Sequence, residues 1–338
     1  MSTSIPLKQF EDHTALIGVI GLGYVGLPLT RAFFDAGFRV LGFDIDDQKV
    51  AMLSRGESYL KHLGDEFIKE MSGDERFGVT SDFGRLGEPD AILICVPTPL
   101  DVHHQPDLSF VEKTTEWVAK SLRPGQLVVL ESTTYPGTTR ERMLPILAET
   151  GLVCGRDFYL AHSPEREDQG RRGVTTNTIP KLVGGLESAS GDVAECMYHQ
   201  AFESVVRVER AEVAEAAKLL ENIYRAVNIA MVNEMKEILS DMDIDIWAVI
   251  EAAATKPFGF QPFYPGPGLG GHCIPIDPFY MSYKAKQVGH TCHFIELAGE
   301  INREMPARVV DRVVRALNDV ERAVRGSKIL VIGLAYKP

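Results

Sequence analysis

Residues 16–26 read LIGVIGLGYVG and join a short apolar run to a glycine-rich turn. The apolar run at 16–20 is typical of a buried strand, and the glycines that follow have the spacing of a strand-to-helix turn. Gly21 permits the tight turn, Gly23 lets a pyrophosphate approach the backbone, and Gly26 lets the helix pack closely against the strand. The stretch therefore predicts a Rossmann-like dinucleotide-binding fold. The predicted contacts are Gly21, Gly23, Tyr24, Val25 and Gly26.

A second apolar run, at residues 38–43, ends in Asp44, eighteen residues after Gly26. In a dinucleotide-binding fold, a carboxylate at this place accepts hydrogen bonds from the adenosine ribose. The same carboxylate repels the 2′-phosphate of NADP, so the pattern favours NAD as the cofactor. The alternative is a glycine turn in an α/β protein that binds no nucleotide, with Asp44 serving as a helix cap.

Short apolar runs alternate with helical periodicity over the first half of the chain, which is typical of a doubly wound parallel sheet covered by helices. We predict strands at residues 16–20, 38–43, 91–96, 127–131, 158–162 and 181–184. Ligands of such sheets bind beyond the carboxyl ends of the strands. Residues 96–99 and 131–134 are therefore predicted at the rim of the cofactor crevice, the alternative being ordinary strand-end turns. The predicted cofactor contacts there are Pro97, Thr98 and Thr133.

The second half of the chain has the pattern of a helical domain. Residues 210–241 contain no glycine or proline and are rich in Ala, Leu, Ile, Val and Met. This predicts one long helix that is buried on most faces, as when two identical copies pack together. A further helix is predicted at about residues 293–325, and the apolar residues 328–334 are predicted to begin a new strand.

A polar stripe interrupts the long helix. Glu215, Lys218, Asn222 and Arg225 are spaced by three, four and three residues, so they lie on one side of the helix. On a surface helix such a stripe is a solvated face. The apolar residues that flank it instead favour a cleft, in which Lys218 and Asn222 could bind an oxyanion or order a water.

Residues 265–280, PGPGLGGHCIPIDPFY, hold one cysteine, Cys273, in a segment crowded with glycine and proline. The glycines and prolines are predicted to exclude regular helix and strand and to let the backbone approach a bound group. Cysteine is the side chain most readily made nucleophilic near neutral pH, and His272 and Asp277 are near it in sequence. The segment therefore predicts a reactive site. The alternative is a buried, inert thiol in a tight turn.

Composition excludes several classes of protein. The net charge of −12 argues against a nucleic-acid partner, which would require a basic face. Five widely spaced cysteines without a CxxC pair suggest neither a disulfide framework nor a zinc site, and no metal site is predicted. No apolar run has the length of a membrane span and the N-terminus has no signal-peptide pattern, so we expect a cytoplasmic protein.

The chain resembles the UDP-glucose and UDP-N-acetylhexosamine 6-dehydrogenase family from about residue 16 to residue 338, in particular the UDP-N-acetyl-D-glucosamine branch. The motifs that carry the resemblance are GLGYVGLPL, CVPTPL, SPERED, KLLENIYRAVNIA and GPGLGGHCIPIDPFY, in the order of the family. The resemblance implies an NAD-dependent enzyme of polysaccharide biosynthesis that acts on a UDP-sugar and forms a homodimer or higher oligomer. Its reaction carries the C6 hydroxyl to a carboxylate in two hydride transfers.

The resemblance also implies roles for individual residues. Cys273 is the implied nucleophile, which traps the intermediate aldehyde as a thiohemiacetal that is then oxidised to a thioester. Lys218 and Asn222 are implied to line the oxyanion and water site. The residues implied to hold or activate the water are Thr133, Glu165 and Asp277. The predicted substrate-binding residues are Glu165, Arg166, Lys218, Asn222, Arg225, Lys256 and Gly270.

The SPER stretch at residues 163–166 resembles the enzymes that act on UDP-N-acetylhexosamines, which favours an acetamido sugar. Gln169 departs from the pattern, because that group usually has proline there. A structural alternative for Glu165 and Arg166 is a surface ion pair or a helix-end interaction. Two other functions stay open: a 3-hydroxyacid-type NAD dehydrogenase without covalent catalysis, and an inactive NAD-binding fragment that dimerises.

These patterns together predict three parts of the chain. Residues 1–207 form an NAD-binding Rossmann-like domain, and residues 208–326 form a helical dimerisation domain that carries the cysteine loop. Residues 327–338 are expected to be the first strand of a truncated α/β domain that binds UDP in the family.

Overall fold

The computed structural model describes residues 7–60, 63–101, 105–166, 178–271 and 273–333. The chain forms two compact units, Met1–Lys218 and Leu219–Pro338. Helix α8 (Ala211–Asp241) runs through the boundary between them. The domain boundaries expected from the sequence remain a prediction.

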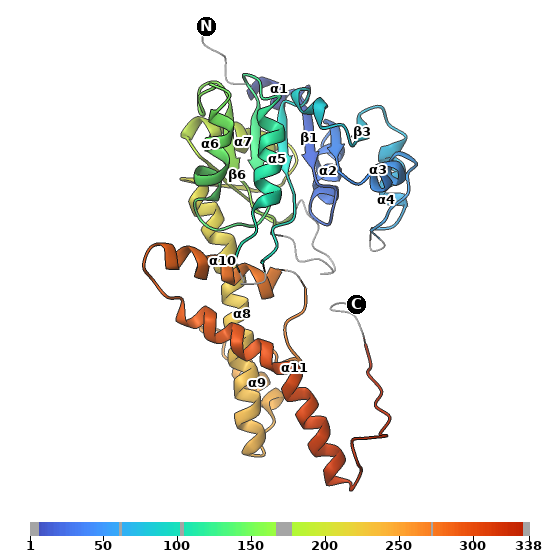
Figure 1. The fold of residues 1–338 in the computed structure, drawn as a ribbon, viewed down its shortest axis with the longest axis vertical. Coiled ribbons are helices and arrows are strands. Elements are labelled where there is room, and N and C mark those ends of the chain that lie inside the picture. Colours follow the sequence, from blue (N-terminus) through green and yellow to red (C-terminus); the bar gives the residue numbers. More distant parts are fainter. Residues whose placement is uncertain (1–6, 61–62, 102–104, 167–177, 272, 334–338) are drawn as a thin grey trace. The chain divides into compact units, whose positions relative to one another are not determined.

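The first unit is built on an eight-stranded sheet with the strand order β3-β2-β1-β4-β5-β6-β7-β8 (Figure 1). The strands are β1 (Leu16–Ile20), β2 (Arg39–Phe43), β3 (Phe77–Thr80), β4 (Ala91–Ile94), β5 (Leu127–Leu130), β6 (Tyr159–His162), β7 (Lys181–Gly185) and β8 (Val205–Val208). All neighbouring strands are parallel except β6 and β7, which are antiparallel. The order of the first six strands is that of a doubly wound dinucleotide-binding sheet.

Helices cover both faces of this sheet. Strands β4, β5 and β6 are buried along their whole length, which requires cover on both sides. The helices described in the first unit are α1 (Leu7–Glu11), α2 (Gly26–Asp35), α3 (Asp47–Ser54), α4 (Glu66–Ser72), α5 (Ser109–Ala119), α6 (Leu144–Ala148) and α7 (Ser188–His199), with the short 3₁₀-helix η1 (Phe83–Gly87) and the π-helical turn η2 (Thr139–Met143). The fold class predicted from the sequence is therefore confirmed.

Two strands were not predicted, and both lie at the edges of the sheet. No residue of β3 is fully buried, and none of β8 is either. Edge strands carry fewer apolar residues than central ones, because only part of their surface meets the core. The antiparallel pairing of β6 and β7 is the one departure from a wholly parallel sheet. An antiparallel pair needs no crossover helix, and the sequence between these strands has no helical periodicity.

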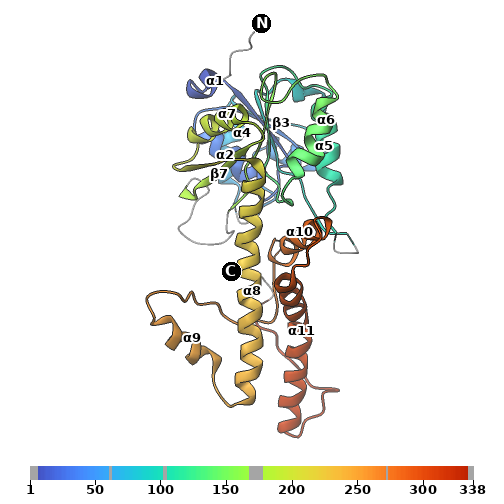
Figure 2. The ribbon, with the colours of Figure 1, turned by 90° about the vertical axis from the view of Figure 1, so that its left-hand side faces the viewer.

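The second unit is helical. Beyond Leu219 the long helix α8 continues to Asp241, followed by α9 (Ile246–Ala254), α10 (Cys273–Gln287) and α11 (His293–Asp319). Helix α11 runs alongside α8, where Ala230 packs against Ala298 and Ile301 (Figure 2). The prediction of one uninterrupted helix at residues 210–241 is confirmed.

Two predictions about local structure are wrong. Residues 273–280 were expected to be irregular, yet they form the first half of α10. Pro275 is the third residue of that helix, where its missing N–H removes no hydrogen bond, and Pro278 removes only one. Residues 328–333 were expected to be a strand, and they form none. Their apolar side chains are exposed, up to 90% at Ile332, and none of the described strands pairs with them.

Among the described residues, no helix combines the length and the apolar character that crossing a bilayer requires. Within the same residues, no group of three or more His, Cys, Asp or Glu side chains is placed to hold a metal ion.

Candidate active site

The glycine-rich turn between β1 and α2 has the geometry that its sequence predicts. Gly21 has φ of +88°, and a Cβ there would lie 2.6 Å from the carbonyl oxygen of Cys95. A Cβ on Gly26 would lie 1.9 Å from the carbonyl oxygen of Gly21, so both glycines are required by the fold itself. A Cβ on Gly23 would meet no atom within 4 Å. Open space beside this backbone is what the predicted approach of a pyrophosphate requires, and that role of Gly23 stays a prediction.

Asp44, at the end of β2, is buried and bonded to that turn. One carboxylate oxygen accepts a hydrogen bond from the N–H of Leu22 at 3.0 Å, and the other accepts from the N–H of Asp46 at 3.0 Å. The ammonium of Lys49 lies 3.6 Å from the oxygen that faces Leu22. Asp44 therefore fixes the glycine turn in addition to its predicted role towards the ribose. Sequence reasoning missed Lys49, which partly offsets the negative charge at this strand end.

The loops that follow β4 and β5 are bonded to each other. The hydroxyl of Thr98 donates to the carbonyl of Thr133 at 2.9 Å, and the hydroxyl of Ser132 donates to the carbonyl of Val96 at 2.6 Å. Pro97 is exposed beside them, as is Tyr24 on the glycine turn, and Val25 is partly buried. The structure thus brings together Thr98 and Thr133, which the sequence placed at the same rim.

Glu165 and Arg166 follow β6 and are partly buried. The N–H of Glu165 lies 3.4 Å from the carbonyl of Glu131, and the guanidinium of Arg166 donates to the carbonyl of Pro180 at 2.9 Å. The backbone of this segment is therefore held against the ends of β5 and β7. Gln169, whose identity weakened the acetamido-sugar prediction, lies outside the described residues.

A buried charged cluster lies at the same end of the sheet. The ammonium of Lys181 is 2.6 Å from a carboxylate oxygen of Glu131, and the hydroxyl of Tyr198 donates to the other oxygen. Burial disfavours the ammonium, but the carboxylates of Glu131 and Glu165 outweigh it and raise the pKa of Lys181. Sequence reasoning missed this ion pair. Its only signal was a charged residue at one end of each of two apolar runs.

His162, the last residue of β6, is fully buried, and neither of its ring nitrogens has a hydrogen-bond partner within the part of the chain that the structure describes. Burial, with a smaller contribution from the nearby charge of Lys181, lowers the pKa of His162 to about 3. The imidazole is therefore neutral at physiological pH.

The first half of the polar stripe on α8 is buried. The carboxylate of Glu215 accepts hydrogen bonds from the N–H of Gly137 at 2.5 Å, from the N–H of Thr139 at 2.9 Å and from the Thr139 hydroxyl at 2.7 Å. Glu215 thus caps η2 and fixes the loop that carries Thr133. Lys218, one turn further along α8, is also buried. The alternative of a solvated face is wrong for these two residues.

The second half of the stripe lies in the helical unit. The amide nitrogen of Asn222 donates to a carboxylate oxygen of Asp277 at 2.5 Å, and the guanidinium of Arg225 donates to the Asn222 oxygen. Asn222 and Asp277 are both buried. The structure therefore places three predicted site residues in direct contact, although they come from helices α8 and α10.

Cys273 is the first residue of α10, and Asp277 follows one helical turn later. His272 lies outside the described residues. Gly270 is partly buried in the segment before the helix. Lys256 is exposed after α9, with its ammonium 5.0 Å from the centre of the Phe258 ring.

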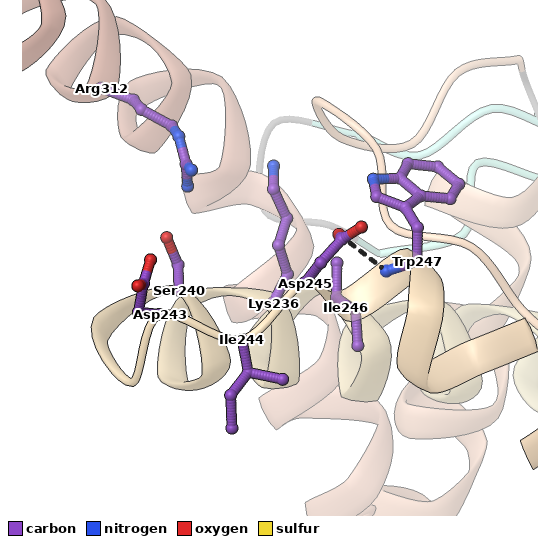
Figure 3. A pocket seen from close by; sticks show the side chains of 8 residues that line it. All are labelled: Lys236, Ser240, Asp243, Ile244, Asp245, Ile246, Trp247 and Arg312. Carbon is purple, nitrogen blue, oxygen red and sulfur yellow. Dashed lines mark hydrogen bonds between the residues drawn. The ribbon is translucent and has the colours of Figure 1, made fainter. Parts of the chain in front are cut away.

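The helical unit also has a pocket of about 320 Å³ between α8, α9 and α11 (Figure 3). The pocket is open to solvent and is lined by both charge signs, Lys236 and Arg312 with Asp243 and Asp245, and the Asp245 carboxylate accepts a hydrogen bond from the N–H of Trp247 at 3.1 Å. None of its lining residues belongs to the predicted site. The constellation of Asn222, Arg225 and Asp277 is therefore distinct from this pocket.

Two parts of the chain match domains of one protein family. Residues 15–202 match the NAD binding domain of the UDP-glucose/GDP-mannose dehydrogenase family, and residues 212–304 match its central domain. The chain belongs to the UDP-glucose/GDP-mannose dehydrogenase family. It is an NAD-dependent nucleotide-sugar dehydrogenase, and the glycine turn with Asp44 lies in its NAD-binding domain.

Relatives within this dehydrogenase family cover most of the chain. Protein CapL of Staphylococcus aureus is 38% identical over 95% of this chain and 74% of its own length. UDP-N-acetyl-D-glucosamine 6-dehydrogenase of Pseudomonas aeruginosa is 36% identical over 95% of this chain and 75% of its own length. The UDP-D-ManNAc dehydrogenase structure from Pyrococcus horikoshii superposes with a TM-score of 0.85 at 34% identity, over 91% of this chain and 72% of that one.

Proposed function

We propose that this dehydrogenase oxidises the C6 hydroxyl of a UDP-N-acetylhexosamine to the uronic acid in two successive oxidations, through a covalent intermediate on Cys273. The observation that supports the proposal most directly lies in the helical unit. Helix α10 begins at Cys273 and carries Asp277 one turn later, in contact with Asn222 at 2.5 Å. We thus assign the nucleophile to Cys273 and the acid or base to Asp277, both on α10. The amide donor is Asn222, on α8.

The residues of the first unit fit the cofactor. The open backbone at Gly23 and the first turn of α2 would hold the pyrophosphate, and Asp44 would face the ribose. Thr98 and Thr133 lie at the carboxyl ends of β4 and β5, where the crevice of a doubly wound sheet is found. NAD, when bound, supplies the acceptor for the hydride lost in each oxidation.

The chain's own residues account for the covalent chemistry. The Cys273 sulfur adds to the aldehyde carbon and forms a C–S bond, and the former carbonyl oxygen becomes a negatively charged oxyanion. Lys218 and Asn222, one turn apart on α8, are assigned to stabilise that oxyanion. Loss of the second hydride leaves a thioester. A water then adds to the thioester carbon, the C–S bond breaks, and the products are the carboxylate and the free thiol.

The hydrolytic water needs groups that hold it and accept its proton. Asp277 is buried against Asn222 and is the carboxylate nearest to Cys273 in the chain, which supports a role for it as the base. Thr133 and Glu165 are assigned to hold the water. Arg166, Arg225, Lys256 and Gly270 are assigned to substrate binding.

Two observations support the proposed class of sugar. The SPER stretch at residues 163–166 resembles enzymes for acetamido sugars, and relatives at 34 to 36% identity are named for UDP-N-acetyl-D-glucosamine and UDP-D-ManNAc. Both names describe a nucleotide sugar with an acetamido group. We therefore propose a UDP-N-acetylhexosamine in preference to UDP-glucose.

The test is to count the NADH formed per sugar consumed, with a panel of UDP-sugars and the wild-type enzyme. Two NADH per UDP-N-acetylhexosamine are expected, whereas a 3-hydroxyacid-type dehydrogenase would form one NADH and would not use these substrates. Cys273→Ser should lower full turnover by orders of magnitude and leave NAD binding intact, because a hydroxyl is a much weaker nucleophile than a thiolate. Two NADH per sugar from Cys273→Ser at the wild-type rate would exclude the covalent mechanism.

We further propose a homodimer formed through α8. Met231, Met235 and Ile238 lie on α8 at spacings of four and three residues, and Met242 directly follows the last residue of the helix, four residues after Ile238, so the four continue one stripe. All four are exposed in the single chain. An exposed apolar stripe of this length indicates a protein interface. In a two-fold symmetric dimer, the stripe of one copy packs against the same stripe of the other copy.

A further inference from the structure

A chain of side-chain hydrogen bonds connects the segment before Cys273 to two helices of the second unit. The N–H of Gly266 donates to the Asn233 oxygen at 2.9 Å, and the Asn233 amide nitrogen donates to the Asn302 oxygen at 3.0 Å. The Asn302 amide nitrogen then donates to the carbonyl of Ala226 at 3.1 Å. Asn233 lies on α8 and Asn302 on α11, and they are 0% and 4% exposed.

The direction of these bonds is fixed by the backbone groups at the two ends. The atom of Gly266 at this contact is its N–H, which can only donate, so Asn233 must present its oxygen to it and its amide nitrogen to Asn302. The atom of Ala226 at its contact is the carbonyl oxygen, which can only accept, so Asn302 must present its amide nitrogen there and its oxygen to Asn233. Each end requires the same arrangement, so neither asparagine can rotate its amide without losing two hydrogen bonds.

The segment also lies against α11. Gly268 has φ of +135°, and a Cβ there would lie 3.5 Å from the Pro306 ring and 3.6 Å from the carbonyl oxygen of Asn302. A side chain at this position would be strained in its backbone whatever the space around it. The segment therefore follows one path over the surface of α11, starting from the bond between Gly266 and Asn233.

Helix α10 is connected to α8 as well, by the bond between Asn222 and Asp277. Asn222 and Asn233 are eleven residues apart on α8, which is about three helical turns, so they lie on the same side. The segment that carries Cys273 is thus attached to one face of α8 both before and after the cysteine. In the part of the chain that the structure describes, the attachment before it runs through two neutral amides, Asn233 and Asn302, that take no part in the proposed chemistry.

We propose that Asn233 and Asn302 are positioning residues, which hold residues 265–271 on α8 and α11 and thereby set the place of Cys273 for the covalent step. The proposal rests on the proposed function of Cys273. The positioning proposal goes beyond that function, because it names two residues that are not assigned to contact substrate or cofactor and that act through the backbone of Gly266.

The experiment compares Asn233→Ala with Asn228→Ala in the full chain. Asn228 is a matched control, because it lies on the same helix and its amide donates to the carbonyl of Tyr224 within that helix. Hydrogen exchange of residues 265–271 should be at least tenfold faster in Asn233→Ala and unchanged in Asn228→Ala. The kcat with the UDP-sugar should fall at least tenfold, while the KM for NAD stays within twofold, since the NAD-binding residues belong to the first unit.

Two further variants keep the inference testable. Asn233→Asp retains an oxygen for the Gly266 N–H, so it should recover part of the exchange protection. Asn302→Ala removes the other amide of the network. If Asn233→Ala does not fold, Asn302→Ala takes its place in the same measurements. Folded Asn233→Ala with wild-type exchange, or with faster exchange and unchanged kcat, would overturn the proposal. A wild-type enzyme that forms no NADH with any UDP-sugar would instead refute the proposed function, and the exchange measurement would still decide whether Asn233 fixes this segment.

Discussion

The ammonium of Lys181 lies 2.6 Å from the carboxylate of Glu131, and the two side chains are 6% and 0% exposed. The pair joins the start of β7 to the residue that follows β5, beneath the rim where Thr133 and Glu165 lie. Removing two charges from water costs free energy. The attraction between the two buried charges offsets that cost only while both partners are present. The pair is therefore a sensitive point of the first unit.

Replacing one member of the pair should destabilise the protein strongly. Lys181→Met leaves the Glu131 carboxylate buried without its counter-charge, which should lower the free energy of unfolding by about 3–5 kcal/mol. The double variant Lys181→Met/Glu131→Leu removes both charges and should recover most of that loss. Urea unfolding of the wild type, both single variants and the double variant measures the coupling. A Lys181→Met variant as stable as the wild type would show that the pair contributes nothing.

His162 should make the protein sensitive to acid. Its pKa of about 3 in the folded state is lower than the value of about 6.5 in an unfolded chain, so the unfolded state binds more protons between these two values. The contribution of His162 to stability is complete above pH 6.5 and is lost as the pH falls towards 3, by about 1.4 kcal/mol per pH unit.

The comparison of wild type with His162→Leu isolates this effect, because every other titrating group is common to both proteins. Urea unfolding between pH 7.5 and pH 4.5 should show the unfolding free energy of the wild type, measured relative to that of the variant, decreasing as the pH is lowered. A difference in unfolding free energy that is the same at all these pH values would show that His162 is not buried as a neutral group.

Features set by local spacing could be predicted from the sequence. Gly21, Gly26 and Asp44 lie where the turn and the strand end require them, because a strand-to-helix turn of this shape admits few residues. The long helix α8 also follows from local sequence. The rule that proline excludes helix failed at Pro275, because the first turn of a helix does not use the N–H that proline lacks.

Contacts between distant residues could not be predicted. Glu131 and Lys181 are 50 residues apart in the chain, and Asn233 and Asn302 are 69 apart. In the sequence, each of these four residues is an ordinary polar residue beside apolar neighbours. Only the folded structure shows that its partner lies within bonding distance. The contact between Asn222 and Asp277 is equally remote in sequence. It was anticipated only as two members of one site, through the resemblance to a family.

Asp44 should control the choice between NAD and NADP. Asp44→Asn removes the negative charge but keeps an oxygen for the Leu22 N–H, so the glycine turn should stay in place. The ratio of kcat/KM for NADP to that for NAD should rise about tenfold, which corresponds to about 1.4 kcal/mol. Asp46→Asn is the control, because Asp46 is exposed and caps α3. An equal rise in both variants would indicate a general effect of charge.

The apolar stripe on α8 should decide the oligomeric state. Met235 lies within that stripe and is 39% exposed in the single chain, so Met235→Glu would place a charge in the centre of a two-fold interface on both copies. The variant should be monomeric by light scattering at a concentration where the wild type is a dimer. Leu297→Glu on α11 is the matched control, because Leu297 is exposed and apolar but lies outside the stripe. A monomeric wild type would refute the proposed dimer, and a Met235→Glu variant that remains a dimer would show that the interface lies away from this stripe.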